Sequence, residues 1–174
     1  MSTTISAPTI KTPTISTSTV HPQAYREACA RLASPVYVVA GADADGPYGA
    51  TASSVCSLSL EPLLLLACLD KRSSTLARLL AGGVFAVNAL PEQQIRLATR
   101  FATRSEFGEK FREVSHRLVG GAPVLDDALV WFVCEVHASY DGGDHTIVVG
   151  AVTALDHRIG QPLVCQDRRY RSLA

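Results

Sequence analysis

The stretch 49–80 holds the side chains best suited to binding a ligand. Thr51–Ser54 (T-A-S-S) is dense in small and hydroxyl-bearing residues, which let a flat ligand approach the backbone and offer donors to carbonyl or phosphate oxygens. After an apolar run, Lys71–Thr75 (K-R-S-S-T) stands where a helix is expected to begin, so free N–H groups, hydroxyls and two cations would form an anion site. Taken separately, the first segment is also typical of an edge strand and the second of plain N-capping. Together they favour a site for a flat, anionic ligand.

A third candidate is His145, which follows the two-glycine turn Asp141–Asp144 (D-G-G-D). The turn would present the imidazole at the start of an apolar strand. A single histidine in such a place is more often a surface imidazole than a catalytic group. On these residues alone both interpretations stay open.

Several common site motifs are absent from the sequence. No G-x-G occurs, and the glycine spacing of 41–46 continues with Pro47 where a P-loop needs Lys, so neither nucleotide fingerprint is present. There is no G-x-S-x-G, and the five histidines show no H-E-x-x-H. The five cysteines form neither a disulfide framework nor a C-x-x-C pair. We therefore expect no metal site.

Composition and charge exclude other classes of protein. The chain has 174 residues, of which 47% are hydrophobic and 18% charged, so it can bury a core. Sixteen Lys and Arg balance sixteen Asp and Glu, which argues against a nucleic-acid binder or a membrane-surface protein. The sequence contains no run of 18 apolar residues, so we expect no transmembrane helix. The five cysteines, which show no disulfide framework, predict a reducing cytoplasm as the compartment.

The first twenty residues differ from the rest. Eleven of them are Ser or Thr, which is typical of a disordered tail, whereas the spacing of Ile5, Ile10 and Ile15 would also suit an arm held by a neighbouring subunit. We predict a Ser/Thr-rich arm over 1–20 and one globular domain over 21–174.

The elements that position these candidates are mainly strands. Alternation is clearest over Val130–Tyr140, and His145–Leu155 would return after the glycine turn. We expect a long loop with short helical turns over Arg104–Gly121. The other expected elements are helices at Tyr25–Leu32, 73–80 and 91–103, and strands at Val36–Ala40, Leu63–Leu69, Val84–Leu90 and Pro162–Cys165.

At least six strands with few helices, joined by hairpin-like links, predict a mainly β chain. A closed or nearly closed antiparallel barrel would hide the strand edges. Strands and helices do not alternate, which argues against a doubly wound sheet.

At these residues the chain resembles the flavin reductase family, which has the FMN-binding, antiparallel split β-barrel with a few peripheral helices. The matching pieces are GATASSVCSLSLEPLLLLACL, the S-S-T segment, FAVNAL at Phe85–Leu90, GGDHTIVVGAV and the closing PLV…RYRSL. They span about residues 25–173 in the family's order. One departure is Cys165–Arg168 (C-Q-D-R), where relatives often carry an aromatic pair and then R-G.

The resemblance implies a flavin site and a pyridine-nucleotide site. The flavin ring, the pyrimidine end of the ring and the ribityl phosphate would be held by successive segments, and a hydride would pass from the nicotinamide to flavin N5. The implied flavin-binding residues are Thr51, Ala52, Ser53, Ser54, Ser57, Ala67, Cys68, Leu69, Arg72, Ser73, Ser74, Thr75, Asn88, Lys110 and Phe111. The implied NAD-binding residues are His145, which would face the nicotinamide and take the catalytic position, Arg168 and Tyr170.

By resemblance the chain is an NADH-dependent flavin reductase. Its flavin would be FAD or FMN, with FAD favoured because Lys110 and Phe111 could serve the outer half of FAD. Reduced flavin would be released to a separate flavin-dependent monooxygenase. A homodimer is expected, since one subunit with few helices cannot cover its apolar strands. Two alternatives are a flavin-retaining oxidase on a similar barrel and a flavin-binding protein that is not an enzyme.

Overall fold

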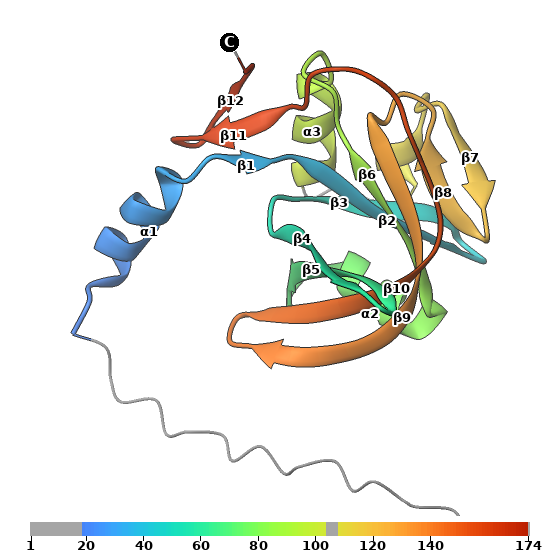
Figure 1. The fold of residues 1–174 in the computed structure, drawn as a ribbon, viewed down its shortest axis with the longest axis horizontal. Coiled ribbons are helices and arrows are strands. Elements are labelled where there is room, and N and C mark those ends of the chain that lie inside the picture. Colours follow the sequence, from blue (N-terminus) through green and yellow to red (C-terminus); the bar gives the residue numbers. More distant parts are fainter. Residues whose placement is uncertain (1–18, 104–107, 174) are drawn as a thin grey trace, which may run out of the picture.

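Apolar and β-branched runs form one seven-stranded antiparallel sheet in a computed structural model that describes residues 19–103 and 108–173 (Figure 1). Most of the predicted arm, residues 1–18, lies outside the described residues. The sheet order is β3-β2-β6-β9-β10-β5-β4, and every pairing is antiparallel. The prediction of a mainly β, antiparallel fold is confirmed. The strands are β2 (Tyr37–Asp43), β3 (Gly46–Ala52), β4 (Val55–Leu60), β5 (Leu63–Asp70), β6 (Val84–Ala89), β9 (Val130–Gly142) and β10 (His145–His157).

The sheet does not close into the barrel that the strand pattern predicts. Its two edge strands, β3 and β4, follow one another along the chain with only Ser53 and Ser54 between them. The chain passes from β3 to β4 without reversing onto itself, so the two strands do not pair. One hydrogen bond, from the Cys68 N–H to the Ser54 carbonyl (2.9 Å), extends the β5 pairing beyond β4. The sheet thus curls but leaves β3 with an edge that pairs with no described strand.

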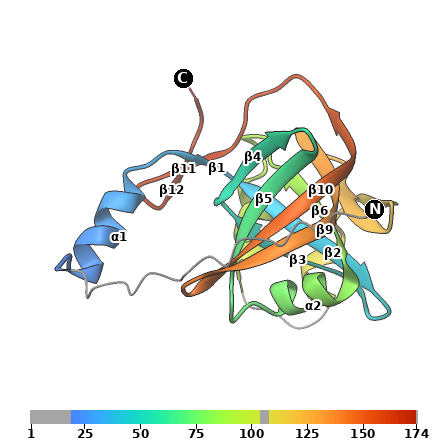
Figure 2. The same ribbon diagram turned by 60° about the horizontal axis from the view of Figure 1, so that its bottom comes forward.

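Two helices pack on opposite faces of β2. Leu76 and Leu79 of α2 (Ser74–Gly82) share a core cluster with Val39, whereas Phe101 of α3 (Ile95–Ala102) shares another with Val38. Neighbouring residues of a strand point to opposite faces, so α2 and α3 lie on opposite sides of the sheet at this edge. Both helices contact β2 and β3; Figure 1 shows α3 near β3, and Figure 2 shows α2 beside β2 and β3.

The third helix, α1 (Pro22–Ala30), stands apart from the sheet and buries none of its residues (Figure 2). Its neighbour is a small sheet in which β11 pairs with both β1 and β12. The strands of the small sheet are β1 (Ser34–Pro35), β11 (Val164–Gln166) and β12 (Arg169–Arg171).

Among the described residues, no helix is long and apolar enough to cross a membrane.

The prediction differs most from the structure in two segments. The helix expected from Pro91 begins at Ile95, because the preceding residues are tied to another segment: Pro91 bridges Pro162, and the Glu92 N–H donates to the Gln161 carbonyl (3.0 Å). The described part of the expected loop at 104–121 contains the 3-10 helix η1 (Glu109–Phe111) and begins a hairpin of β7 (His116–Val119) and β8 (Ala122–Leu125). The missed signal was Gly120-Gly121, both of which have positive φ, as a tight hairpin turn requires.

Candidate functional site

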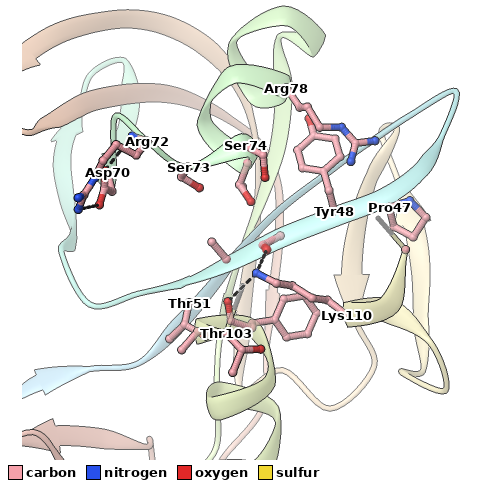
Figure 3. A pocket seen from close by; sticks show the side chains of 16 residues that line it. Pro47, Tyr48, Thr51, Asp70, Arg72, Ser73, Ser74, Arg78, Thr103 and Lys110 are labelled. Atoms are coloured by element: carbon pink, nitrogen blue, oxygen red, sulfur yellow. Dashed lines mark hydrogen bonds and ion pairs between the residues drawn. The ribbon is translucent and has the colours of Figure 1, made fainter. Parts of the chain in front are cut away.

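A cleft of about 400 Å³ lies along the free edge of β3 (Figure 3). One wall comes from the link between β5 and α2 and from the first turns of α2. The other wall comes from the end of α3 and from η1. In Figure 3 Ser73 and Ser74 lie on one side of β3, and Thr103 and Lys110 on the other. The cleft therefore spans an edge strand between two helices that the sheet holds on its opposite faces.

The backbone of β3 supplies polar groups to this cleft. The Gly49 carbonyl accepts a hydrogen bond from Lys110 Nζ (3.1 Å), so it faces away from β2. Polar groups alternate in direction along an antiparallel strand, so Thr51 also turns its N–H and C=O to the free edge. The Thr51 hydroxyl donates to the Ala98 carbonyl at 2.6 Å, which uses its hydrogen to anchor α3. Thr51 therefore offers a ligand its backbone N–H and the remaining lone pairs of its oxygen.

The N-terminus of α2 opens onto the same cleft. Ser73 occupies the N-cap position, but its side chain makes no capping hydrogen bond, and the first turn carries no acidic residue. The first N–H groups of a helix, here those of Ser74 and Thr75, have no acceptor within the helix. Both residues line the cleft with Ser73. Unpaired N–H groups, hydroxyls and the positive end of the helix dipole suit a phosphate.

Arg72 adds a partly neutralised cation beside this terminus. Its Nε and NH2 groups donate to the two carboxylate oxygens of Asp70 at 3.1 and 2.8 Å. The guanidinium holds the pKa of Asp70 well below its usual range. Since Asp70 stays ionised, Arg72 is a positioned hydrogen-bond donor more than a source of net positive charge.

Lys110 is the uncompensated cation of the cleft. Its Nζ donates to the carbonyls of Gly49 and Phe101 (3.1 and 3.0 Å), and no carboxylate pairs with it among the described residues. Burial lowers its pKa. Two carbonyl dipoles position the ammonium without neutralising its charge, so this wall favours an anion.

Tyr48 and Arg78 also line the cleft, and the sequence interpretation missed both. The Arg78 guanidinium lies 4.1 Å from the centroid of the Tyr48 ring and pairs with Asp43, whose pKa it lowers. Arg78 follows Ser74 by one helical turn, and this i, i+4 spacing was the available signal. Nothing local in the sequence marks Tyr48, whose buried hydroxyl has no hydrogen-bond partner among the described residues.

The structure brings together only some of the predicted flavin-binding residues. Those that line the cleft are Thr51, Arg72, Ser73, Ser74, Thr75 and Lys110. Those whose side chains are buried in the core are Ala52, Ala67, Leu69, Asn88 and Phe111, the last in an edge-to-face contact with Phe101. Those on or beside β4 and β5, outside the cleft lining, are Ser53, Ser54, Ser57 and Cys68.

Asn88 has a structural role that the resemblance did not suggest. Its side chain is fully buried; Nδ2 donates to the carbonyls of Val38 and Pro123 (3.3 Å each), and Oδ1 accepts from the Leu125 N–H (2.9 Å). Asn88 therefore joins β6 to β2 and β8, and it is not among the residues that line the cleft.

We expect Asn88→Ala to destabilise the protein while leaving flavin affinity unchanged. Loss of the amide leaves the buried Leu125 N–H without an acceptor, which costs about 1–3 kcal/mol. Urea unfolding measures that loss, and titration with FMN measures affinity in the folded protein. Unchanged stability together with a clear loss of FMN affinity would contradict the structural role.

His145 lies beside the cleft, outside its lining. In the strand register it is opposite Asp70, and its Nδ1 is 2.7 Å from Asp144 Oδ1, with the side chain partly exposed. Asp70 itself lines the cleft. The imidazole is thus held on a strand at one end of the cleft.

The remaining two predicted residues come from the C-terminal hairpin. Arg168 lines a second hollow, between α1 and the turn that joins β11 to β12. Tyr170 is partly buried and packs against the core cluster that contains Phe101. The structure therefore does not bring either residue into the cleft at β3.

Comparisons with known proteins agree with this architecture. The family model described as "Flavin reductase like domain" matches residues 29–174. The chain is 42% identical over 156 residues to FMN reductase (NADH) RutF 2 of Methylorubrum extorquens, an alignment covering 88% of this chain and 91% of that protein. The NADH:FAD oxidoreductase SgcE6 of Streptomyces globisporus superposes with a TM-score of 0.84 at 32% identity, covering 89% of this chain and 96% of that one.

A further structural neighbour belongs to a two-component system. BorF, the flavin reductase component of a bacterial two-component tryptophan halogenase, superposes with a TM-score of 0.82 at 30% identity, covering 88% of this chain and 98% of that one. A family match over most of the chain and a close curated relative confirm the resemblance inferred from the sequence. This chain is therefore a member of the flavin reductase like domain family.

Proposed function

We propose that the protein is an NADH-dependent flavin reductase whose flavin occupies the cleft at the free edge of β3. The observation that carries this proposal is the uncapped N-terminus of α2, which opens onto the same cleft as the unpaired backbone of β3. The first feature suits the flavin phosphate and the second suits the polar edge of the ring. The relatives named FMN reductase and NADH:FAD oxidoreductase support the assignment.

The residues of the chain act by binding and orientation. A bound flavin supplies the hydride acceptor, and Ser73, Ser74 and Thr75 would hold its phosphate. The N–H of Thr51 at the strand edge would orient the ring. Holding two reactants in place can contribute roughly 7–11 kcal/mol to lowering a barrier, so a site of this kind needs no nucleophile of its own.

A preference for FAD over FMN is part of the proposal. Lys110 puts a cation on the wall of the cleft opposite the N-terminus of α2, where it suits a second phosphate. The relatives include reductases named for each flavin, so the comparisons support flavin as a class. Competition between FAD and FMN in steady-state kinetics measures this preference.

The decisive experiment is NADH oxidation by the purified protein with and without added FAD or FMN. Rapid oxidation that requires free flavin is the expected result. A protein that keeps a flavin and oxidises another substrate would instead be the flavin-retaining oxidase. A protein that binds flavin but leaves NADH unchanged would be a carrier.

We further propose that reduced flavin leaves for a flavin-dependent monooxygenase, in the cytoplasm. BorF, which serves a halogenase of two components, supports a separate oxygenating partner. Five unpaired cysteines support a reducing compartment.

A homodimer completes the proposal, because large apolar side chains stay exposed on α1 and around the turn between β4 and β5. Leu60 is 83% exposed, Tyr25 65% and Leu63 52%. Sedimentation tests the dimer, and a monomer that binds flavin normally would contradict it.

His145→Ala is expected to raise the KM for NADH by about 5- to 30-fold, because one hydrogen bond to the nicotinamide or its phosphates would be lost. Flavin affinity and kcat should change little, since hydride transfer needs no acid at this position. His137→Ala, an exposed histidine on the same hairpin, is the matched control. A fall in kcat of about 100-fold would instead indicate that His145 transfers a proton. Wild-type kinetics in the variant would show that His145 is a surface imidazole without a role in the reaction.

A further inference from the structure

The cleft at the free edge of β3 contains a carboxylate that an anion site does not need. The N-terminus of α2 and the ammonium of Lys110 suit an anionic ligand, yet Asp70 also lines the cleft. Asp70 is the only acidic residue among the described residues of that lining. A negative side chain lowers the affinity of such a site for an anion. None of the functions proposed above assigns a role to this carboxylate.

Asp70 is fixed in place by three hydrogen bonds from Arg72. Its Oδ1 accepts from the backbone N–H and the Nε of Arg72 (2.8 and 3.1 Å), and its Oδ2 accepts from the NH2 group (2.8 Å). Its backbone carbonyl accepts from the Ser73 N–H (2.9 Å). In Figure 3 the carboxylate and the guanidinium lie together to one side of Ser73. The chain thus holds a carboxylate at the link that leads into α2.

The pair of Asp70 and Arg72 carries no net charge. Hydrogen bonds from Arg72 hold the pKa of Asp70 well below its usual range, so the carboxylate is ionised at neutral pH. The side chain of Asp70 is 35% exposed and that of Arg72 is 75% exposed, so solvent screens both charges. Removal of the negative charge alone would leave Arg72 as a net cation beside the N-terminus of α2.

The proposed reaction changes the charge of the ligand in this cleft. A hydride carries two electrons and one proton from NADH to the flavin ring, which leaves NAD+ and a ring with one more negative charge until the ring takes up a proton from water. Oxidised flavin must bind in the cleft, whereas reduced flavin must leave it. A fixed carboxylate repels the more negative form more strongly, so it favours this exchange.

We propose that Asp70 is a specificity-determining residue that lowers the affinity of the cleft for anionic flavin, and most of all for reduced flavin, so that the product leaves. The inference rests on the proposed function, in which free flavin is a substrate. Asp70 acts by its own charge and by cancelling the charge of Arg72. A cleft without this carboxylate would hold its flavin more tightly.

The variant Asp70→Asn (D70N) tests this role, because asparagine keeps an oxygen that can accept from the Arg72 backbone N–H but carries no charge. Anaerobic titrations measure the Kd values of three ligands of increasing negative charge, namely riboflavin, FMN and reduced FMN. We expect D70N to bind FMN about two- to fivefold more tightly than the wild type does, which is the contribution of an exposed pair of charges. Reduced FMN should gain at least about twofold more than FMN, and riboflavin should bind equally. Damage to the fold would instead weaken all three ligands.

D141N is the matched control. Asp141 forms an ion pair with Lys71, and neither residue lines the cleft. The control removes one carboxylate charge from the chain, as D70N does, and should bind all three ligands as the wild type does. If D70N does not fold, R72Q gives the reciprocal test. Its unpaired carboxylate should raise the ratio of the Kd of reduced FMN to that of FMN at least about twofold, and an unchanged ratio overturns the inference.

Equal or weaker binding of FMN and reduced FMN by D70N overturns the inference, and so does an equal gain for riboflavin and reduced FMN. NADH oxidation separates this failure from that of the proposed function. If both proteins oxidise NADH with added FMN but bind FMN and reduced FMN equally, the proposed function stands and the role of Asp70 falls. If D70N binds the ligands in the expected order but neither protein oxidises NADH with any flavin, the proposed function fails and Asp70 still sets the flavin affinity.

Discussion

Ser73→Asp is expected to weaken FMN binding by at least about 100-fold while the protein stays folded. Ser73 is the N-cap of α2 and lines the cleft. A carboxylate there would face the phosphate that the N-terminus of α2 is proposed to hold. Two like charges about 4 Å apart repel by about 4 kcal/mol at an effective dielectric of 20, and solvent in the open cleft reduces this to roughly 3 kcal/mol. That repulsion corresponds to the expected loss of affinity.

The same substitution should leave α2 intact. Asp is as good an N-cap residue as Ser, and its charge interacts favourably with the positive end of the helix dipole, by about 0.3–1 kcal/mol. The Tm is therefore expected to stay constant or rise slightly. A binding loss accompanied by a stable helix separates repulsion of the ligand from damage to the fold.

Riboflavin, which lacks the phosphate, provides the control. The Ser73→Asp variant should bind it as tightly as the wild type does, whereas S73A/T75A, which removes two hydroxyls without adding charge, should lose only about 0.5–1.5 kcal/mol per hydrogen bond toward FMN. Calorimetric titration measures each of these affinities. Equal affinity of Ser73→Asp and the wild type for FMN would place the phosphate elsewhere.

The sequence predicted those parts of the site that are formed by short, contiguous segments of the chain. Hydroxyls at the expected start of a helix indicate an anion site within five residues, 71–75, and the structure places that helix start in a cleft. Thr51–Ser54 is typical of an edge strand, and Thr51 does end on the free edge of β3. Neither inference required knowledge of distant contacts.

The residues that were missed depend on contacts between distant segments. Tyr48 of β3 lies beneath the guanidinium of Arg78, which α2 carries. Asn88 was assigned to the flavin by resemblance alone, and its structural role depends on the Leu125 N–H of β8, 37 residues away along the chain. Alternation along a strand tells which residues share a face of the sheet, but it does not tell whether the two edges of the sheet meet. A closed or nearly closed barrel was therefore predicted where the sheet stays open.

Lys110→Met is expected to weaken binding of FAD by about 10- to 100-fold at neutral pH, because Lys110 is proposed to hold the second phosphate and a hydrogen bond to a charged group contributes about 1.5–3 kcal/mol. The Gly49 and Phe101 carbonyls, now facing the open cleft, can bind water instead of Nζ, so the unfolding free energy should change by less than about 1 kcal/mol. Lys110→Arg keeps the charge and is the matched variant. Wild-type affinity in Lys110→Met would show that the ammonium serves only the two carbonyls.

The pH dependence of flavin affinity gives a second readout of Lys110. Burial without a carboxylate lowers its pKa, so in the absence of ligand the folded chain releases this proton more readily than the unfolded chain does. This lysine therefore opposes folding most below its lowered pKa, and the opposition fades as pH rises toward the ordinary value of 10.5. A phosphate beside the ammonium reverses the shift, so flavin binding takes up a proton in that window. Affinity should be full below the lowered pKa and fall as pH rises through it in the wild type, stay high in Lys110→Arg, and show no such step in Lys110→Met. Parallel curves for all three proteins would assign the pH dependence to another group.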